Sequence, residues 1–424
     1  MTRRIGKYEL RNVLGEGASS TVYLALDTFS GEDVALKVLK PESVPDPQLE
    51  KTRTSQFLNE ASLAGKLSHP HIASILEAAV DENSGYIAIE YVPGGDLSQY
   101  TAAGHLLPVE EAIEIAFKCC SALNYAFRQG IVHRDIKPAN IMVLDGTNIK
   151  VTDFGAAYLL KAKETQALDI GSPLYMSPEQ VLNRPLDHHS DMFALGVVLY
   201  ELFTGQRPFV ADTLDALFGK ILREDPVPPS ALRREISPDV DRVLLQMLRK
   251  DSEARYPTWA DLALDLADIG RLSTSRRGIP DIEKFTGLRK VALLERLNDA
   301  ELWELVHTGR WTRIAAQTLV VREGDPGHSL FFIGSGQVKV TKRGRLLNVV
   351  TAGEFVGDMA YIKAGAIPRQ ATVESISDVL IAEFKPVNLQ RTSKNCQLEL
   401  TLALTTLLVD RLALADERLA RGAE

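Results

Sequence analysis

A glycine-rich turn is the first feature whose residue types suit a defined chemistry. Gly15 and Gly17 belong to the run Gly-Glu-Gly-Ala-Ser-Ser-Thr-Val over residues 15–22, between two predicted strands. Glycines at such a turn let backbone amides lie close over phosphate groups. The same turn also fits an ordinary hairpin, so by itself it does not establish a nucleotide site.

A lysine in an apolar strand is the second such feature. Lys37 ends the run Val-Ala-Leu-Lys, in the third strand of a predicted antiparallel meander. A lysine between apolar neighbours in mid-strand needs an anionic partner, because an unpaired buried charge is costly. Glu60, on the helix predicted to follow, is the natural partner.

Three further motifs follow in the central part of the chain. They are His-Arg-Asp-Ile-Lys-Pro-Ala-Asn over residues 133–140, Asp-Phe-Gly over residues 153–155, and Ser-Pro-Glu over residues 177–179. Together with the glycine turn and the lysine, they resemble the eukaryotic-like protein kinases, with every main motif of that family in sequence order. The resemblance covers about residues 8–270 and implies an ATP- and Mg²⁺-dependent phosphotransferase.

The resemblance assigns a role to each polar residue around the phosphates. It implies that Lys37 holds the α- and β-phosphates of ATP and that Glu60 orients Lys37. It implies that Asp153 and Asn140 bind the Mg²⁺ ions that bridge the phosphates. A loose phosphoryl transition state offers little covalent work, so positioning and charge neutralisation are expected to supply most of the rate.

The resemblance also predicts the class of acceptor. Asp135 would accept or orient the proton of the substrate hydroxyl, and Lys137 marks Ser/Thr rather than Tyr specificity while adding charge at the γ-phosphate. Departures from the family pattern are small, because Ser20 replaces the third glycine of the turn and Ser177 replaces an alanine. A pseudokinase would require the loss of Lys37 or of either key aspartate, and all are present.

An adenine-binding region is implied by the same resemblance. Backbone groups of Glu90 and Val92 would hydrogen-bond adenine, Asp96 would reach the ribose, and Ile89 would be the gatekeeper residue. Apolar residues would sandwich the ring, although each fits a plain core role equally well; they are Leu14, Val22, Ala35 and Met142. Two features resemble structural parts of the family, namely the helix aspartate Asp191 and the ion pair of Glu179 with Arg255.

Regulation by phosphorylation is predicted from Arg134. An arginine directly before the catalytic aspartate often accompanies activation-loop phosphorylation in this family, because it can pair with a phosphate and order the loop. Ser172 matches the hydroxyl that touches the catalytic aspartate and the substrate, so we favour Thr165 as the phosphosite. A solvated loop threonine with no such role is the alternative.

The C-terminal part carries a second set of motifs. The runs Gly-Glu-Phe-Val-Gly-Asp-Met-Ala from residue 353 and Pro-Arg-Gln-Ala-Thr-Val from residue 368 resemble the phosphate-binding cassette of cyclic nucleotide-binding domains. By this likeness Arg369 would pair with the cyclic phosphate, and amides near Gly357 and Met359 would assist. Asp358 stands where the family usually has Glu for the ribose hydroxyl, and Gln370 where a small residue or Thr tunes base preference.

Two readings of this C-terminal domain stay open. In the first, it binds cAMP or cGMP and regulates the kinase; in the second, it is a nucleotide-independent docking or dimerisation module. A closing helix over about residues 398–419 could pair with a second copy in a homodimer or pack on its own barrel. Its apolar positions include Leu398, Leu402, Leu408, Leu412 and Leu419. We expect no DNA binding, because no helix-turn-helix follows this helix.

The elements that must position these residues change character along the chain. Short strands and one helix over residues 8–91 predict a β-rich N-lobe, and mainly helical segments over residues 95–270 predict a C-lobe. The run over residues 271–281 lacks apolar periodicity and is the predicted linker. Short strands with glycine turns over residues 282–424 predict a β-barrel or jelly roll with flanking helices, so the fold class is α+β. We place the kinase domain at residues 1–270.

Composition limits the remaining possibilities. The 424 residues include 48 basic and 56 acidic ones, for a net charge of −8, which excludes the overall basic footprint of a nucleic-acid binder. Three cysteines without a Cys-x-x-Cys spacing, an N-terminus without a signal sequence, and apolar stretches too short for a bilayer predict a cytoplasmic protein with no membrane span. The kinase-first order predicts a bacterial signalling protein that acts on protein substrates.

Overall fold

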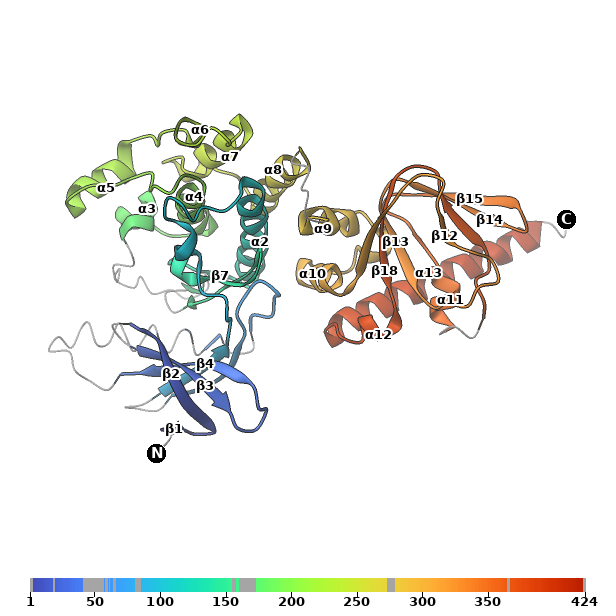
Figure 1. Cartoon of the computed structure of the whole chain (residues 1–424), viewed down its shortest axis with the longest axis horizontal. Coiled ribbons are helices and arrows are strands. Elements are labelled where there is room, and N and C mark those ends of the chain that lie inside the picture. Colours follow the sequence, from blue (N-terminus) through green and yellow to red (C-terminus); the bar gives the residue numbers. More distant parts are fainter. Residues whose placement is uncertain are drawn as a thin grey trace. The chain divides into compact units, whose positions relative to one another are not determined.

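The chain divides into two compact units, Met1–Ser273 and Thr274–Glu424, and each is described by itself. The computed structural model (Figure 1) describes residues 3–17, 20–40, 57, 60, 62–63, 66–80, 85–154, 158–159, 173–272, 279–363 and 367–421. The division falls inside the predicted linker. The functional limits of the two domains stay a prediction.

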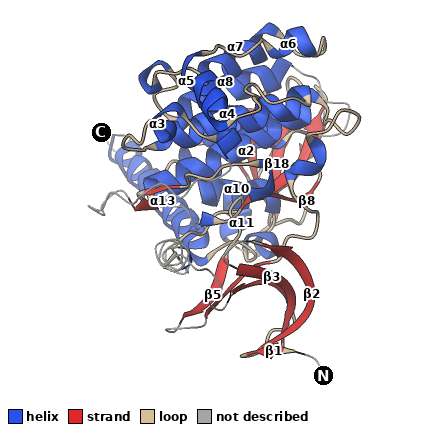
Figure 2. Ribbon diagram, turned by 90° about the vertical axis from the view of Figure 1, so that its left-hand side faces the viewer, coloured by secondary structure: helices blue, strands red, loops and turns tan. Residues whose placement is uncertain are grey.

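A six-stranded antiparallel sheet opens the first unit. Its order is β1-β2-β3-β4-β6-β5, and Figure 2 shows several of its strands at the N-terminal end. The strands are β1 (Arg4–Ile5), β2 (Tyr8–Glu16), β3 (Ser20–Asp27), β4 (Asp33–Leu39), β5 (Ile75–Val80) and β6 (Gly85–Glu90). Strand β4 buries Val34 and Leu36 in one core cluster. Because side chains alternate along a strand, Ala35 and Lys37 face the other side of the sheet.

Helices form the rest of the first unit. Helix α4 (His188–Thr204) is buried along almost its whole length, as expected for a helix that is apolar on every face, and it packs against α2 (Val109–Arg128). Other α-helices with described bounds in this unit are α3 (Pro178–Val181), α5 (Leu214–Arg223), α6 (Pro229–Leu232), α7 (Pro238–Met247) and α8 (Trp259–Leu272). Two short hairpin-like sheets pair β8 (Ile141–Asp145) with β9 (Asn148–Val151), and β7 (Ile131–Val132) with β10 (Tyr158–Leu159).

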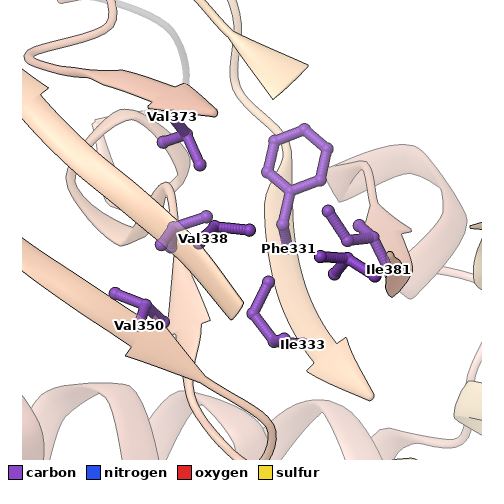
Figure 3. Packing of buried hydrophobic residues seen from close by; sticks show 8 residues of the cluster. Phe331, Ile333, Val338, Val350, Val373 and Ile381 are labelled. Carbon is purple, nitrogen blue, oxygen red and sulfur yellow. The ribbon is translucent and has the colours of Figure 1, made fainter. Parts of the chain in front are cut away.

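The second unit contains two four-stranded sheets, in agreement with the predicted β-rich domain. One sheet orders β11 (Arg310–Ile314), β18 (Val379–Phe384), β13 (Leu330–Ser335) and β16 (Phe355–Val356). The other orders β12 (Leu319–Val321), β17 (Thr372–Ser375), β14 (Gln337–Lys342) and β15 (Arg345–Thr351). Side chains of both sheets meet in one apolar cluster, which Figure 3 shows; it includes Phe331, Ile333, Val338, Val350, Val373 and Ile381.

Helices flank these sheets. They are α9 (Asp281–Arg289), α10 (Asp299–Thr308), α11 (Asp358–Ile362), α12 (Pro386–Leu389) and α13 (Lys394–Arg421). Helix α13 contains the closing helix predicted from the sequence. Among the described residues, no helix is both long enough and apolar enough to cross a bilayer. The three cysteines are buried and free.

Candidate active site

Lys37 lies between two acidic side chains in the first unit. Its Nζ is 2.5 Å from Glu60 Oε2 and 2.8 Å from Asp153 Oδ1. Burial alone would lower the pKa of Lys37, but the negative charges of Glu60 and Asp153 outweigh it and raise that pKa. Burial alone would raise the pKa of Asp153, yet Lys37 holds it below its usual value. Lys37 is therefore an ammonium and Asp153 a carboxylate at neutral pH.

A tight loop holds Asp135 beside two of the other predicted catalytic residues. Lys137 Nζ lies 2.6 Å from Asp135 Oδ2. The Asn140 side-chain amide donates to the Asp135 backbone carbonyl at 2.8 Å and to Asp135 Oδ2 at 3.2 Å. The Thr152 backbone amide donates to the Asn140 carbonyl at 2.9 Å, which links this loop to the residue before Asp153.

The buried carboxylate of Asp191 anchors the start of this loop. It accepts hydrogen bonds from the backbone amides of His133 and Arg134, each at 2.7 Å. Arg134 and Asp153 have left-handed φ values of 69° and 62°, which are uncommon for residues other than glycine and cluster at functional sites. His133 Nε2 donates to the Thr152 carbonyl at 2.9 Å, so the strained backbones are held by buried partners.

The predicted adenine-binding segment, residues 90–96, is called the hinge below and is fixed by close backbone packing. The Val143 amide donates to the Gly95 carbonyl at 2.8 Å. A Cβ atom on Gly94 would clash with the Val143 carbonyl oxygen, so only glycine fits there. The Glu90 carboxylate accepts from the Ser74 amide at 3.1 Å and pairs with Lys150 Nζ at 3.0 Å.

The residues predicted to bind adenine and ribose come from this hinge and from neighbouring strands. Val92 is buried. The Asp96 side chain accepts a hydrogen bond from the Ser98 amide at 2.8 Å, and the Asp96 backbone forms an isolated antiparallel β-bridge with Met142. Ala35 pairs with Ile89 across β4 and β6. The four predicted ring contacts come from different strands and keep some exposure to solvent; they are Leu14, Val22, Ala35 and Met142.

The glycine turn continues the hairpin of β2 and β3. Gly15 pairs with Val22, and the Gly17 amide donates to the Ser20 carbonyl at 2.9 Å. A Cβ on Gly15 would meet no atom within 4 Å, so space in the folded chain does not by itself demand glycine there. Close approach of a ligand to the backbone is one physical reason for glycine at this turn.

The predicted phosphosites fall outside the described residues. They are Thr165 and Ser172. Arg134 itself is described, and its backbone carbonyl accepts a hydrogen bond from Gln180 Nε2 at 2.9 Å. Sequence reasoning missed this contact and the Glu90–Lys150 pair. The pattern Ser-x-x-Gln over residues 177–180 could have predicted Gln180 as part of a helix capping box, which it also forms.

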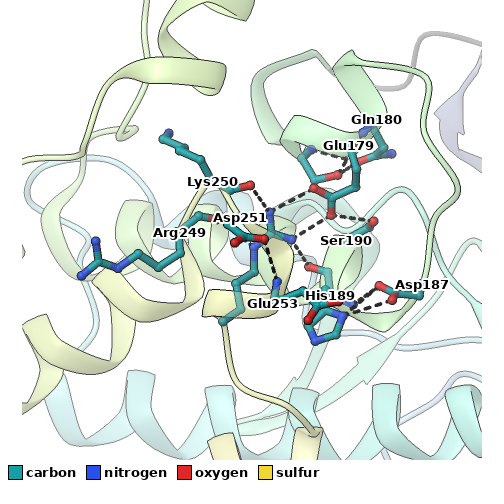
Figure 4. A network of polar contacts seen from close by, with 11 residues as sticks. Glu179, Gln180, Asp187, His189, Ser190, Arg249, Lys250, Asp251 and Glu253 are labelled. Carbon is teal, nitrogen blue, oxygen red and sulfur yellow. Dashed lines mark hydrogen bonds and ion pairs between the residues drawn. The ribbon is translucent and has the colours of Figure 1, made fainter.

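A buried ion pair stabilises the helical lobe. Arg255 binds Glu179 in a bidentate arrangement, with Nη1 2.7 Å from Oε1 and Nη2 3.0 Å from Oε2. Figure 4 shows Glu179 and Ser190 in this polar network. Ser190 Oγ also donates to Glu179 at 2.8 Å. Burial alone would raise the pKa of Glu179, but these partners lower it, so the pair stays charged.

The second unit brings Arg369 and Gly357 together. Arg369 is 7% exposed, and its Nη1 donates to the Ser329 carbonyl at 2.9 Å. Gly357 has φ +93°, and a Cβ there would lie 3.0 Å from Arg369 Nη1, so the two residues are neighbours. No carboxylate within the described parts of the unit forms an ion pair with Arg369, and burial lowers its pKa. Glu383 lies beyond ion-pair distance, but its charge opposes this shift of the Arg369 pKa. A buried guanidinium without a directly paired carboxylate suits an anionic ligand.

The other predicted cassette residues differ in their surroundings. Asp358 is the first residue of α11 and is buried, whereas Met359 beside it is half exposed. The Gln370 side chain donates to the Pro368 carbonyl at 2.8 Å. Gly357 is the N-cap of α11 and has a left-handed backbone conformation.

Comparison with known proteins agrees with this geometry. The profile of the protein kinase domain family matches residues 8–264, and that of the cyclic nucleotide-binding domain family matches residues 311–395. The serine/threonine-protein kinase PknB of Mycobacterium leprae is 36% identical over 335 residues, which cover 73% of this chain and 52% of that protein. PknB of Mycolicibacterium smegmatis is 37% identical over 289 residues, covering 66% and 45%.

The chain belongs to the protein kinase family, because the kinase profile covers more than half of it. Its fold is that of a kinase domain followed by a cyclic nucleotide-binding domain. The chain spans about half the length of the curated relatives that it matches.

Proposed function

We propose that the chain is a serine/threonine protein kinase that transfers the γ-phosphate of ATP to protein hydroxyls. The observation that carries the proposal is Lys37 held between Glu60 and Asp153, beside a loop in which Asp135, Lys137 and Asn140 contact one another. A pseudokinase scaffold is disfavoured because these polar contacts are intact. Lys137 beside Asp135 favours Ser/Thr acceptors.

Each residue of this set has a distinct task in the proposed reaction. Lys37 neutralises charge on the ATP phosphates, and Glu60 keeps its ammonium in position. Asp135 accepts a hydrogen bond from the acceptor hydroxyl and takes its proton as the new bond forms. Lys137 lies beside Asp135 and supplies positive charge where the γ-phosphate is transferred.

The residues present fit a Mg²⁺ site. Asp153 is held as a carboxylate by Lys37, and Asn140 supplies an amide, which together form the oxygen-rich donor set that Mg²⁺ prefers. When bound, the ion would neutralise phosphate charge. Asp153 and Asn140 are the residues that would hold it.

Autophosphorylation and phosphorylation of a generic protein substrate test the proposal. We expect Lys37→Met and Asp153→Ala to reduce the rate by at least about 10²-fold, since each removes charge stabilisation from the transition state. Lys220→Met, on the surface of α5, is the matched control and should keep wild-type activity. Retained activity in the two site variants, with unchanged melting temperatures, would overturn the assignment.

We further propose that the second unit binds a cyclic nucleotide, cAMP or cGMP, and that binding regulates the kinase. The observation that favours this is Arg369, a buried cation beside the backbone of Gly357 that forms no ion pair with any described carboxylate; Glu383 acts on it only from beyond ion-pair distance. Arg369 would bind the cyclic phosphate, and Asp358 and Gln370 would lie near the sugar and base. The sign of the regulation is left to the measurement.

Calorimetric titration of the full chain with cAMP and with cGMP tests nucleotide binding. We expect binding in the wild type, loss of at least tenfold in affinity in Arg369→Ala, and no change in Arg345→Ala, whose side chain is exposed. Kinase assays with and without the same nucleotides test regulation. No heat in the wild type would favour the docking or dimerisation module instead.

The alternative module has its own supporting observation. Helix α13 leaves apolar side chains exposed, with Leu398 at 54%, Leu402 at 39% and Leu408 at 41%. Such a face fits a second copy of the helix. Sedimentation should show a dimer of the wild type and a monomer of the double variant Leu398→Gln, Leu402→Gln. A monomeric wild type would exclude dimerisation through α13. The side chains of Leu412 and Leu419 lie outside the described set.

A further inference from the structure

Three consecutive residues at the start of α4 form a cluster of metal-binding types. Asp187 is the N-cap of the helix, and His188 and His189 are its first two residues. One potential ligand atom from each lies within 4.8 Å of the other two. The proposed phosphotransfer uses none of these side chains. Figure 4 shows Asp187 and His189 beside the Glu179–Arg255 network.

His188 has one ring nitrogen that accepts no hydrogen bond from any described residue. Its Nε2 lies 3.0 Å from the Pro257 carbonyl oxygen. A carbonyl only accepts, so Nε2 carries the proton and Nδ1 of the neutral ring keeps a lone pair. Nδ1 is buried and has no hydrogen-bond partner in the described part of the chain. A metal-binding histidine usually donates its other N–H to a carbonyl or carboxylate, as His188 does here.

The other two groups stand at the spacing of neighbouring ligands. His189 Nδ1 is 3.1 Å from each carboxylate oxygen of Asp187, in a hydrogen bond that the ring N–H donates; an ion bound between these groups would displace that proton. Ligands at 2.0–2.1 Å from one ion stand about 3 Å apart. The rings of His188 and His189 are 3.9 Å apart between centroids. The Asp187 side chain is about half exposed, which gives an ion access from solvent.

We propose that Asp187, His188 and His189 bind one divalent transition-metal ion of the zinc type. Two imidazoles and a carboxylate form a donor set that suits zinc, whereas Mg²⁺ prefers oxygen ligands alone. The positive N-terminal end of the α4 helix dipole disfavours a cation at this place. The Arg255 guanidinium, which donates to the His189 carbonyl at 2.7 Å, also disfavours it. The Asp187 carboxylate and Glu179 offset these charges.

The expected consequence is stiffening of the turn that anchors the catalytic loop. Asp191, two residues after His189, holds the backbone amides of His133 and Arg134. An ion bound to Asp187, His188 and His189 would restrain the same first turn of α4. Its role would be structural, and the phosphotransfer would not need it.

Metal titration of the chelator-treated full chain, with Mg²⁺ present, tests the proposal. We expect one Zn²⁺ per chain to bind by calorimetry and to raise the melting temperature of the transition that ATP also shifts. Affinity should fall at least tenfold in His188→Ala, in His189→Ala and in Asp187→Asn, which keeps a good N-cap residue. His105→Ala, an exposed histidine of the same unit, is the matched control and should bind as wild type.

Two measurements that need no variant complete the test. Co²⁺ should give the visible absorption of a tetrahedral or five-coordinate site with nitrogen ligands, and crystals soaked in Zn²⁺ should show an anomalous peak beside His188. Equal Zn²⁺ affinity in the wild type and all three variants would overturn the proposal. So would an anomalous peak only at other residues, or no peak.

Discussion

At the scale of single residues, the site depends on charges kept in place by burial. Glu60 is almost fully buried, and burial raises its pKa despite the attraction of Lys37. A raised pKa means that the ionised carboxylate costs stability at neutral pH. Glu60 therefore positions Lys37 while the burial of its own carboxylate opposes ionisation.

Asp191 gives a first prediction at this scale. Its two oxygens accept from two backbone amides, and an asparagine offers only one acceptor oxygen in the same place. We expect Asp191→Asn to lose about 1–3 kcal/mol of stability and to lower activity, because one buried amide is left without a partner. Urea unfolding and a kinase assay on the same variant measure both. Unchanged values for both would show that the loop does not depend on this anchor.

Lys250 gives a prediction of pH dependence. Burial lowers the pKa of its ammonium to about 8, while the ring of Phe209, 3.8 Å from Nζ, favours the charged form. A lysine whose pKa is lower in the folded state binds fewer protons there than in the unfolded chain. The loss of folding stability caused by burying the charged Lys250 ammonium is therefore fully present below pH 8. It is relieved as the pH rises from about 8 to 10.5.

We accordingly expect Lys250→Met to stabilise the first unit at pH 7 by about 1–2 kcal/mol. The gain should shrink toward pH 10. Urea unfolding at both pH values, read from the transition that ATP and Mg²⁺ shift, measures it. A destabilised variant at pH 7 would mean that the contact with Phe209 outweighs the cost of burial.

At the scale of elements, the hinge depends on how closely two backbone segments approach. Gly94→Ala would push a methyl group into the Val143 carbonyl of β8. We expect a loss of about 1–3 kcal/mol and a raised KM for ATP, because the hinge must move away from β8. Gly219→Ala on α5 is the control, since its added Cβ would meet only the flexible end of Arg223. Equal behaviour of both variants would contradict this account.

The same elements show how far the sequence predicts the structure. The strand pattern predicted an antiparallel meander whose third strand carries Lys37, and Lys37 lies on β4 of an antiparallel sheet. Local patterns contain no information on which carbonyl a distant segment presents. The bond of Arg369 to Ser329 and the approach of Gly94 to Val143 join residues 40 or more positions apart, so only the folded backbone reveals them.

At the scale of the whole molecule, the chain joins two units whose sites are proposed to communicate. Each unit has its own sheets and its own apolar core. Regulation then requires that the cyclic nucleotide bind more tightly to one state of the kinase than to another, since equal affinity would shift nothing. Burial of Arg369 favours an anionic ligand in the second unit. Coupling between that ligand and the kinase site is a separate quantity with its own measurement.

Thermodynamic linkage supplies that measurement, because coupling between two binding sites is reciprocal. If a cyclic nucleotide changes the affinity for ATP by some factor, a non-hydrolysable ATP analogue with Mg²⁺ must change the affinity for the cyclic nucleotide by the same factor. We expect a factor of about 5 to 150, the usual range for allosteric coupling. Calorimetric titration of the full chain with cAMP or cGMP, with and without the analogue, measures it. In Arg369→Ala the response of ATP affinity to the nucleotide should vanish while ATP binding itself persists. Equal cyclic-nucleotide affinities in both wild-type titrations would mean that the two sites bind independently, and any regulation would then have to act on the rate of transfer alone.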